Sequence, residues 1–234
     1  MTVNPSSRRN RNLRLNLLIS SLLFVFGVSS LAASAVSLAE ENFLFAFRYM
    51  TMNGTVFTTL VSLIIIIVCI TEMVTGKAVK LRQLYYLRLC SAVTECIIAV
   101  VIMLSLLPFV PDNPNLLTYD SFTMHVIIPL LAIASFLLNP LPVESMHPLL
   151  RLNCAWLITL YAAVVITMIL LGLIPQDKIP YSFMDFRSRP LVYSICIGCF
   201  VYSFTYVLSV WLTDGNKRVS RFWTDEKNRP AHSE

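Results

Sequence analysis

The chain has 234 residues, of which 56% are hydrophobic and only 13% are charged, and its mean hydropathy is +0.71. A soluble globular domain carries about 25% charged residues, so this composition excludes an ordinary soluble domain. The formal net charge of +5 is not a sign of nucleic-acid binding, because the basic residues gather at the ends of apolar segments, where membrane topology accounts for them.

Six apolar runs follow one another, each close to or above the roughly 18 residues that a membrane-crossing helix needs. Short polar segments separate them, so neighbouring helices are expected to be antiparallel. Because lipid forces a spanning backbone to satisfy its own hydrogen bonds, the sequence predicts an all-α polytopic membrane protein. It is expected to form one six-helix domain over 1–234, with polar, flexible tails at 1–12 and 215–234. The predicted spans are Leu15–Leu38, Thr51–Met73, Leu84–Leu107, Phe122–Leu138, Leu152–Ile174 and Leu191–Leu212.

The first run has one competing interpretation. The basic segment Arg8–Arg14, the apolar stretch after it and the small residues Ala33–Ala35 also resemble a secretory signal peptide with its cleavage site. The stretch is longer than the usual apolar region of a signal peptide, which favours a retained span. Cleavage would leave five spans and would not change the orientation of the others.

The basic residues divide unequally between the two sides of the predicted membrane. With the N-terminus inside, fourteen of the 18 Lys and Arg residues fall on the inner side and four on the outer side. The positive-inside rule therefore predicts a multi-pass protein of the cell membrane with both termini in the cytoplasm. The inner residues are Arg8, Arg9, Arg11, Arg14, Lys77, Lys80, Arg82, Arg88, Arg151, Lys217, Arg218, Arg221, Lys227 and Arg229, and the outer ones are Arg48, Lys178, Arg187 and Arg189.

The second span carries a stripe of hydroxyl side chains. They recur at i, i+4, i+7, i+8 and i+11, which places them on one face of a helix. Small polar residues commonly let membrane helices approach closely and share hydrogen bonds, and packing is the structural interpretation of each of them. The residues of this hydroxyl face are Thr51, Thr55, Thr58, Thr59 and Ser62.

The fourth span contains His125, the only histidine in an apolar run, about one turn inside its outer end. An ionisable side chain at this depth is a functional hypothesis by default; the alternative is a histidine at the interface that hydrogen-bonds a neighbouring helix. Pro129 follows four residues later. Proline has no N–H to donate to the carbonyl of His125, so the helix is predicted to kink there.

The predicted topology brings two of these residues together. Spans two and four both enter the membrane from the outer side, so Thr51 and His125 lie at a similar depth and their side chains are predicted to approach closely. A hydroxyl beside an imidazole is the minimal pair of nucleophile and base. Asp120 precedes span four and is a candidate for orienting the imidazole ring. Glu95 lies about 10 Å deeper, where it is expected to be protonated or bonded to a neighbour.

Other motifs point to no cofactor and no metal. Cys196 and Cys199 form a C-x-x-C motif within the sixth span, but without further ligands nearby they are interpreted as small, buried apolar residues. The nucleotide-binding, G-x-S-x-G and H-E-x-x-H motifs do not occur in the sequence. Nucleotide-driven transport and the commonest hydrolase and zinc-protease classes are therefore not favoured.

Three segments resemble a known family, the androgen-induced-protein-like six-span membrane proteins. The segment Phe47–Asn53 is similar to the family's Lys/Arg-Tyr-Leu-Thr-x-x-Asn opening of span two, and His125–Leu131 is similar to its His-x-x-x-Pro segment. Tyr181–Asp185 is similar to its Tyr-Pro-Phe loop, with Ser182 where proline is usual. The departure at Ser182 concerns the geometry of that loop.

The resemblance implies an activity. Animal members of the family are threonine hydrolases that cleave fatty acid esters of hydroxy fatty acids, so it implies Thr51 as nucleophile and His125 as its partner. The first hypothesis is therefore an intramembrane hydrolase of lipid-like esters that takes its substrate from the membrane lipids. The second is a non-enzymatic carrier or channel for small solutes, with the hydroxyl face, Glu95 and His125 along a polar path. The third is a structural membrane protein.

The inner half of the second span bears on this choice. Between Ser62 and Glu72 it is almost entirely apolar, which favours a pocket that is closed on the inner side over a continuous path. The site is accordingly predicted to be an apolar cavity open toward the outer leaflet. It is expected to be bounded by the kink at Pro129 and roofed by Tyr181–Phe186.

Overall fold

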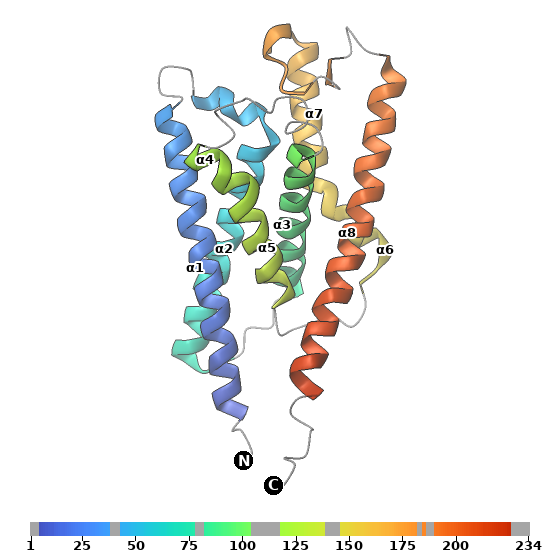
Figure 1. Ribbon diagram of the computed structural model, residues 1–234. Helices are drawn as coiled ribbons and strands as arrows, with labels where there is room; N and C mark the ends of the chain where they lie inside the picture. Colours follow the sequence, from blue (N-terminus) through green and yellow to red (C-terminus); the bar gives the residue numbers. More distant parts are fainter. Residues whose placement is uncertain are drawn as a thin grey trace.

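The long helices of the computed structural model lie side by side and form one bundle (Figure 1). In the part of the chain that the structure describes, all regular secondary structure is helical, and six helices are long and apolar enough to cross a membrane. The predicted all-α fold is thereby confirmed. The structure describes residues 5–37, 43–77, 82–103, 118–138, 146–181, 184–185 and 190–225.

Four spans are single long helices, and the fourth and fifth are each composed of three consecutive helical segments. Short 3₁₀ helices (η1, η5 and η6) lie between or before the long ones, and η4 is a π-helical turn. In chain order the elements are α1 (Pro5–Ser37), η1 (Phe43–Arg48), α2 (Met50–Thr75), α3 (Arg82–Val101), α4 (Tyr119–Phe122), η4 (Thr123–Ile127), α5 (Ile128–Leu137), α6 (Pro148–Leu152), η5 (Asn153–Ala155), α7 (Trp156–Leu170), η6 (Gln176–Lys178) and α8 (Leu191–Asp225).

The six spans fall where the apolar runs predict them, with differences at their ends. The fifth was predicted to reach Ile174, but α7 ends at Leu170. Gly172 adopts a left-handed backbone with φ of 72°, and the N–H of Leu173 donates to the carbonyl of Met168 at 2.9 Å, which is a glycine-based helix stop. The apolar helical segments are Asn12–Ser37, Met50–Thr75, Gln83–Val101, Tyr119–Leu137, Pro148–Leu170 and Leu191–Arg221.

Parts of both predicted tails, 1–12 and 215–234, are helical, because α1 begins at Pro5 and α8 ends at Asp225; the flexibility of the tails stays a prediction. α1 begins at Pro5, and proline is favoured in the first turn of a helix. α8 continues past the apolar run because Asn216 is buried against α5. Its side-chain amide donates to the carbonyls of Phe136 and Leu137, each at 3.0 Å. These bonds give side-chain partners to carbonyls in the last turn of α5.

α3 lies within the bundle and packs against α2, α5 and α8; its predicted end at Leu107 falls outside the described residues.

Two glycines let helices approach closely around α2. A Cβ placed on Gly27 of α1 would lie 2.0 Å from Thr59 Oγ1, and one on Gly54 would lie 2.4 Å from Ile98 Cδ1. Contacts this short mean that any added side chain would displace Thr59 or Ile98, so α1, α2 and α3 form a tightly packed unit.

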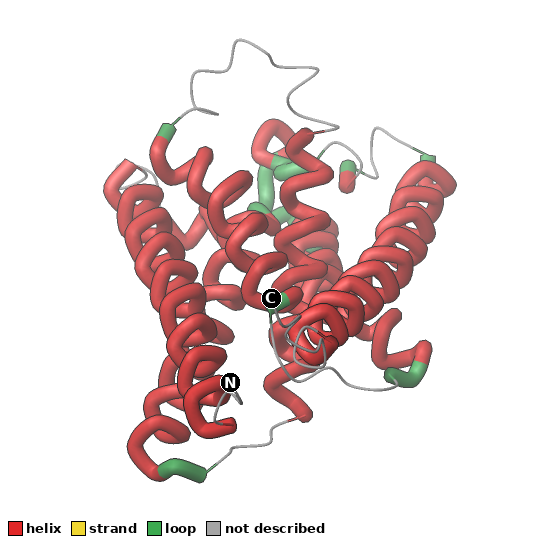
Figure 2. Tube along the Cα trace, turned by 60° about the horizontal axis from the view of Figure 1, so that its bottom comes forward, coloured by secondary structure: helices red, strands yellow, loops and turns green. Residues whose placement is uncertain are grey.

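α7 and α8 form a less buried side of the protein. Only 28% of the α7 span and 17% of the α8 span is buried. Figure 2 shows α8 at the edge of the molecule, leaning away from the other long helices. The exposed side chains of α8 are largely apolar, among them Leu191, Ile195, Phe200 and Val207, which suits a helix that faces lipid.

Candidate functional site

The hydroxyl face of α2 is buried along its whole length, as a single helical face should be. Its exposed fractions range from 0% at Thr55 to 9% at Thr51. Thr59 and Ser62 donate to the carbonyls four residues before them, so these two hydroxyls serve the helix itself. Thr51, in the first turn of α2, instead turns to a side chain on another helix.

Thr51 Oγ1 lies 3.2 Å from Nε2 of His125, so the predicted approach of the two side chains is confirmed. Thr51 lies at the beginning of α2, and His125 lies in the π-helical turn η4 near the beginning of the fourth span. The residues are 74 positions apart in the chain. Successive spans run antiparallel, so α2 and the fourth span start at the same end of the bundle. This brings the two residues together.

The other ring nitrogen of His125 defines the tautomer. Nδ1 lies 2.7 Å from the backbone carbonyl of Ser121, and a carbonyl can only accept a hydrogen bond. In the neutral ring Nδ1 therefore carries the hydrogen and Nε2 is the acceptor. Thr51 then donates its hydroxyl hydrogen to Nε2, which is the arrangement that a base needs in order to take that proton.

Pro129 and the π-helical turn explain the position of the ring. A proline ring clashes with the carbonyl four residues before it in a regular α-helix. The turn Thr123–Ile127 avoids this with wider spacing: the N–H of Ile128 donates to the carbonyl of Thr123, five residues back. The irregularity expected from Pro129 is thus a π-helical turn that contains His125.

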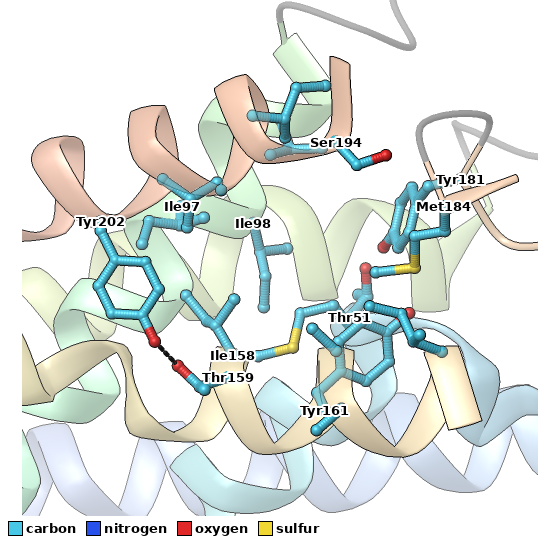
Figure 3. A pocket seen from close by; sticks show the side chains of 18 of the residues that line it. Thr51, Ile97, Ile98, Ile158, Thr159, Tyr161, Tyr181, Met184, Ser194 and Tyr202 are labelled. Carbon is cyan, nitrogen blue, oxygen red and sulfur yellow. Dashed lines mark hydrogen bonds between the residues drawn. The ribbon is translucent and has the colours of Figure 1, made fainter. Parts of the chain in front are cut away.

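A cavity of about 380 Å³ lies on the other side of Thr51. It is lined from the beginning of α2, the C-terminal part of α3, the middle of α7, the N-terminal half of α8 and the chain after η6. The prediction that Pro129 bounds the cavity is wrong: α5 contributes no lining residue, because the cavity lies between α3, α7 and α8. Thr51, Tyr181 and Met184 are at one end, and Thr159 and Tyr202 are at the other (Figure 3).

Tyr181 is a neighbour of Thr51. The sequence predicts it only as part of the segment that covers the cavity. Burial raises the pKa of Tyr181 to about 12, against the opposing effects of hydrogen bonds with the Met50 backbone and the Thr51 side chain, while Tyr49 adds to the rise. The phenol therefore stays protonated at neutral pH. Of the predicted roof Tyr181–Phe186, Tyr181 and Met184 line the cavity; Ser182, Phe183 and Phe186 lie outside the described residues.

The two acidic candidates take other roles. Asp120 accepts a hydrogen bond from Ser34 of α1 at 2.8 Å, and the group bonded to Nδ1 of His125 is the Ser121 carbonyl. The expectation that Asp120 orients the ring is thus replaced by a backbone contact. Glu95 is fully buried and accepts from Thr58 at 2.7 Å, as expected of a carboxyl group bonded to a neighbour in the membrane.

The cysteines differ in burial. Cys69, Cys90, Cys96 and Cys154 are buried, whereas Cys196 and Cys199 are exposed on α8. The prediction of burial is wrong for this pair because so little of the α8 span packs against the rest of the protein. Among the described residues, no three His, Cys, Asp or Glu side chains are placed to hold one metal ion.

Fold and site together define a multi-pass, all-helical membrane protein with a hydroxyl–imidazole pair beside an apolar cavity. Comparison of the chain with protein-family models, curated proteins and solved structures finds no match.

Proposed function

We propose that this protein is an intramembrane hydrolase of lipid-like fatty acid esters, with Thr51 as nucleophile and His125 as base. The observation that carries the proposal is the 3.2 Å contact from Thr51 Oγ1 to an acceptor nitrogen of His125, with Thr51 also lining an apolar cavity. The resemblance of the two segments around these residues to a family of threonine hydrolases supports the same pair.

The reaction needs only these groups and water. As Thr51 Oγ bonds to the ester carbonyl carbon, its proton passes to His125 Nε2 and the carbonyl oxygen becomes an oxyanion. The oxyanion collapses, the ester C–O bond breaks, and the proton on Nε2 passes to the departing alkoxide. Water then attacks the acyl-threonine with His125 again as base, which releases the fatty acid and restores the hydroxyl.

Tyr181 supports this chemistry as a hydrogen-bond donor beside Thr51. The phenol keeps its hydrogen at neutral pH, as an ordinary tyrosine does, and burial raises its pKa further, to about 12. A donor held in a site without much water stabilises a developing oxyanion far more than the same donor does in bulk solvent. We assign Tyr181 to this role, and Ser121 to positioning the ring of His125 through its carbonyl.

The alternative of a solute carrier or channel needs a polar lining from one side of the membrane to the other. The cavity described here is lined mainly by apolar side chains, from α3, α7 and α8. Its lining residues on α3 begin only at Ile97 and those on α8 end at Tyr202, so they belong to the outer parts of both helices. This arrangement favours a binding pocket for an apolar molecule.

The test is ester hydrolysis by purified protein in lipid nanodiscs, with a panel of long-chain esters. Thr51→Ala and His125→Ala should each lower turnover by about a hundredfold or more, and a fluorophosphonate probe should label Thr51 in the wild type only. Thr59→Ala is the matched control, because Thr59 lies on the same helix about 12 Å deeper and should have a milder effect. An unchanged rate for folded Thr51→Ala would show that Thr51 is not the nucleophile.

We also propose that both termini are cytoplasmic and that the protein resides in the cell membrane. The fourteen-to-four division of basic residues supports this orientation, and the beginning of α1 and the end of α8 lie at the same end of the bundle (Figure 1). Reporters fused at Glu234 and inserted at Asn113 should report opposite sides. The same signal at both positions would contradict the topology and the shared depth of Thr51 and His125.

A further inference from the structure

The cavity beside Thr51 has polar groups at its two ends and apolar walls between them. Thr51 and Tyr181 bring hydroxyl groups to one end (Figure 3). The walls carry Ile98, Ile158 and Val201, together with other aliphatic side chains of α3, α7 and α8. This pattern fits a ligand with one polar group and a long apolar part, with the polar group next to Thr51.

The second end of the cavity is closed by a hydrogen bond between α7 and α8. The hydroxyls of Thr159 and Tyr202 are bonded to each other, as Figure 3 shows. Thr159 already donates its one hydroxyl hydrogen to the carbonyl of Ala155 at 2.9 Å, so Tyr202 is the donor in this bond. Both side chains are exposed, and this end of the cavity therefore borders the lipid.

Gly198 leaves an opening in the α8 wall between these two ends. It lines the cavity, and a Cβ placed on it would meet no atom of the described residues within 4 Å. Gly27 and Gly54 are glycines because another helix occupies the space of a side chain. At Gly198 that space is empty. Because Ser194, Val201 and Tyr202 on the same face of α8 also line the cavity, a side chain at position 198 would point toward it.

The volume limits the ligand. A methylene group fills roughly the same volume as a water molecule, about 30 Å³, so 380 Å³ holds roughly a dozen of them. One unbranched acyl chain of medium length fits this space. A longer chain would have to separate Tyr202 from Thr159.

We infer that this cavity binds the single acyl chain of an ester substrate, with the carbonyl at Thr51 and the chain along Gly198 toward the Thr159–Tyr202 bond. Gly198 and Tyr202 are then the residues that determine which chains are accepted. The inference rests on the proposed hydrolysis, because it takes Thr51 as the reacting end. Binding can nevertheless be measured without turnover, and this separates the two claims.

The binding experiment uses a dodecanoyl ester with a diazirine at the end of its chain, photolysed with purified protein in nanodiscs of unlabelled phospholipid. Wild type and Thr51→Ala should both be labelled on α7 or α8 near Thr159 and Tyr202. Gly198→Leu fills the cavity and should reduce labelling at least fivefold. Cys199→Leu is the matched control, because Cys199 is the next residue on α8, is exposed and does not line the cavity; it should be labelled like the wild type.

The rate experiment compares butanoyl, dodecanoyl and hexadecanoyl esters. Gly198→Leu should lower the dodecanoyl-to-butanoyl rate ratio at least tenfold, and Tyr202→Ala should raise the hexadecanoyl-to-dodecanoyl ratio at least threefold. Labelling that Gly198→Leu leaves unchanged, or that does not occur in the wild type, would overturn the acyl site. Labelling that depends on Gly198 in a protein without esterase activity would support the acyl site and refute the hydrolase proposal.

Discussion

Helices α3 and α8 both cross the bundle, but 67% of the α3 span is buried against only 17% of the α8 span. Around α3 and its neighbour α2, glycines bring backbones together and polar side chains bond across helices, as Thr58 does to Glu95. Around α8, side chains face outward and a cavity remains next to Gly198. The two sides of the protein therefore differ in packing although their composition is similar.

The difference matches what each side would have to do. A nucleophile and its base need a separation held within a fraction of an ångström, and Thr51 lies on the tightly packed helix α2. A ligand that enters from lipid needs free volume and a helix that can move aside. The cavity is lined in part by α8, the least buried of the six spans. Thr51 belongs to both sides of the protein, because it bonds to His125 and also lines the cavity.

The largest expected effect comes from the same substitution at a tight and at an open glycine. Gly27→Leu should destabilise the protein by about 3 kcal/mol, because even a Cβ would overlap Thr59 Oγ1 at 2.0 Å. Gly198→Leu should leave stability nearly unchanged, since the side chain enters empty space. Thermal denaturation in detergent, followed by the monodisperse fraction on size exclusion, measures both. Equal losses would show that the two sides do not differ in packing.

A second comparison removes one hydroxyl from each side. Thr58→Val takes the hydrogen-bond donor from the fully buried carboxyl group of Glu95 and should cost about 2 kcal/mol. Thr159→Val removes the partner of Tyr202 at an exposed position and should cost less than about 0.5 kcal/mol. The same denaturation assay applies. The double variant Thr58→Val/Glu95→Leu should recover part of the loss, because no buried carboxyl group is then left without its donor.

The smallest effect concerns Tyr181 at high pH. Its folded-state pKa of about 12 exceeds the ordinary value of about 10, so folding favours the protonated phenol. This contribution to stability is complete below about pH 10 and is lost as pH rises toward 12, because the unfolded chain releases its proton first. The stability advantage of wild type over Tyr181→Phe should therefore shrink between pH 9 and pH 11.5.

The shift in melting temperature between the two pH values should differ by about 4 °C or more between wild type and Tyr181→Phe, because the difference between the two pKa values costs roughly 2 kcal/mol over this range. Tyr206→Phe, at an exposed position on α8, is the control. A difference that stays constant over this range would mean that Tyr181 is not held as a buried phenol beside Thr51.

Much of the fold could be predicted because hydropathy alone locates the spans. Their alternating direction then brings Thr51 and His125 to one depth without any knowledge of packing. The end of α7 could also have been found, since Gly172 is a stop signal within an apolar run. The predicted kink correctly located a helix irregularity but not its form, because a π-helical turn depends on the bond from the Ile128 N–H to the Thr123 carbonyl just before Pro129.

The cavity could not be located from sequence in the same way. Its walls come from α3, α7 and α8, and which faces of these helices meet depends on contacts between residues far apart in the chain. Periodicity does not distinguish a face toward lipid from a face toward a cavity, since both are apolar. For this reason the sequence predicts that Cys196 and Cys199 are buried, whereas the structure shows both exposed. The contact of Tyr181 with Thr51 depends on the path of the connection after α7, for which the sequence offers only a short motif.

The anchoring of α8 at one end has a mechanical consequence. Asn216 ties the C-terminal part of the helix to the end of α5 through two hydrogen bonds, whereas the N-terminal part is held mainly by apolar contacts and the Thr159–Tyr202 bond. α8 therefore resembles a lever with its pivot near Asn216. Gly198 is 18 residues from that pivot, about 27 Å along the axis, so a tilt of only about 5° moves it by roughly 2.4 Å. A small rotation at the fixed end would thus be amplified into a widening between α7 and α8 of more than half the roughly 4 Å width of a methylene chain.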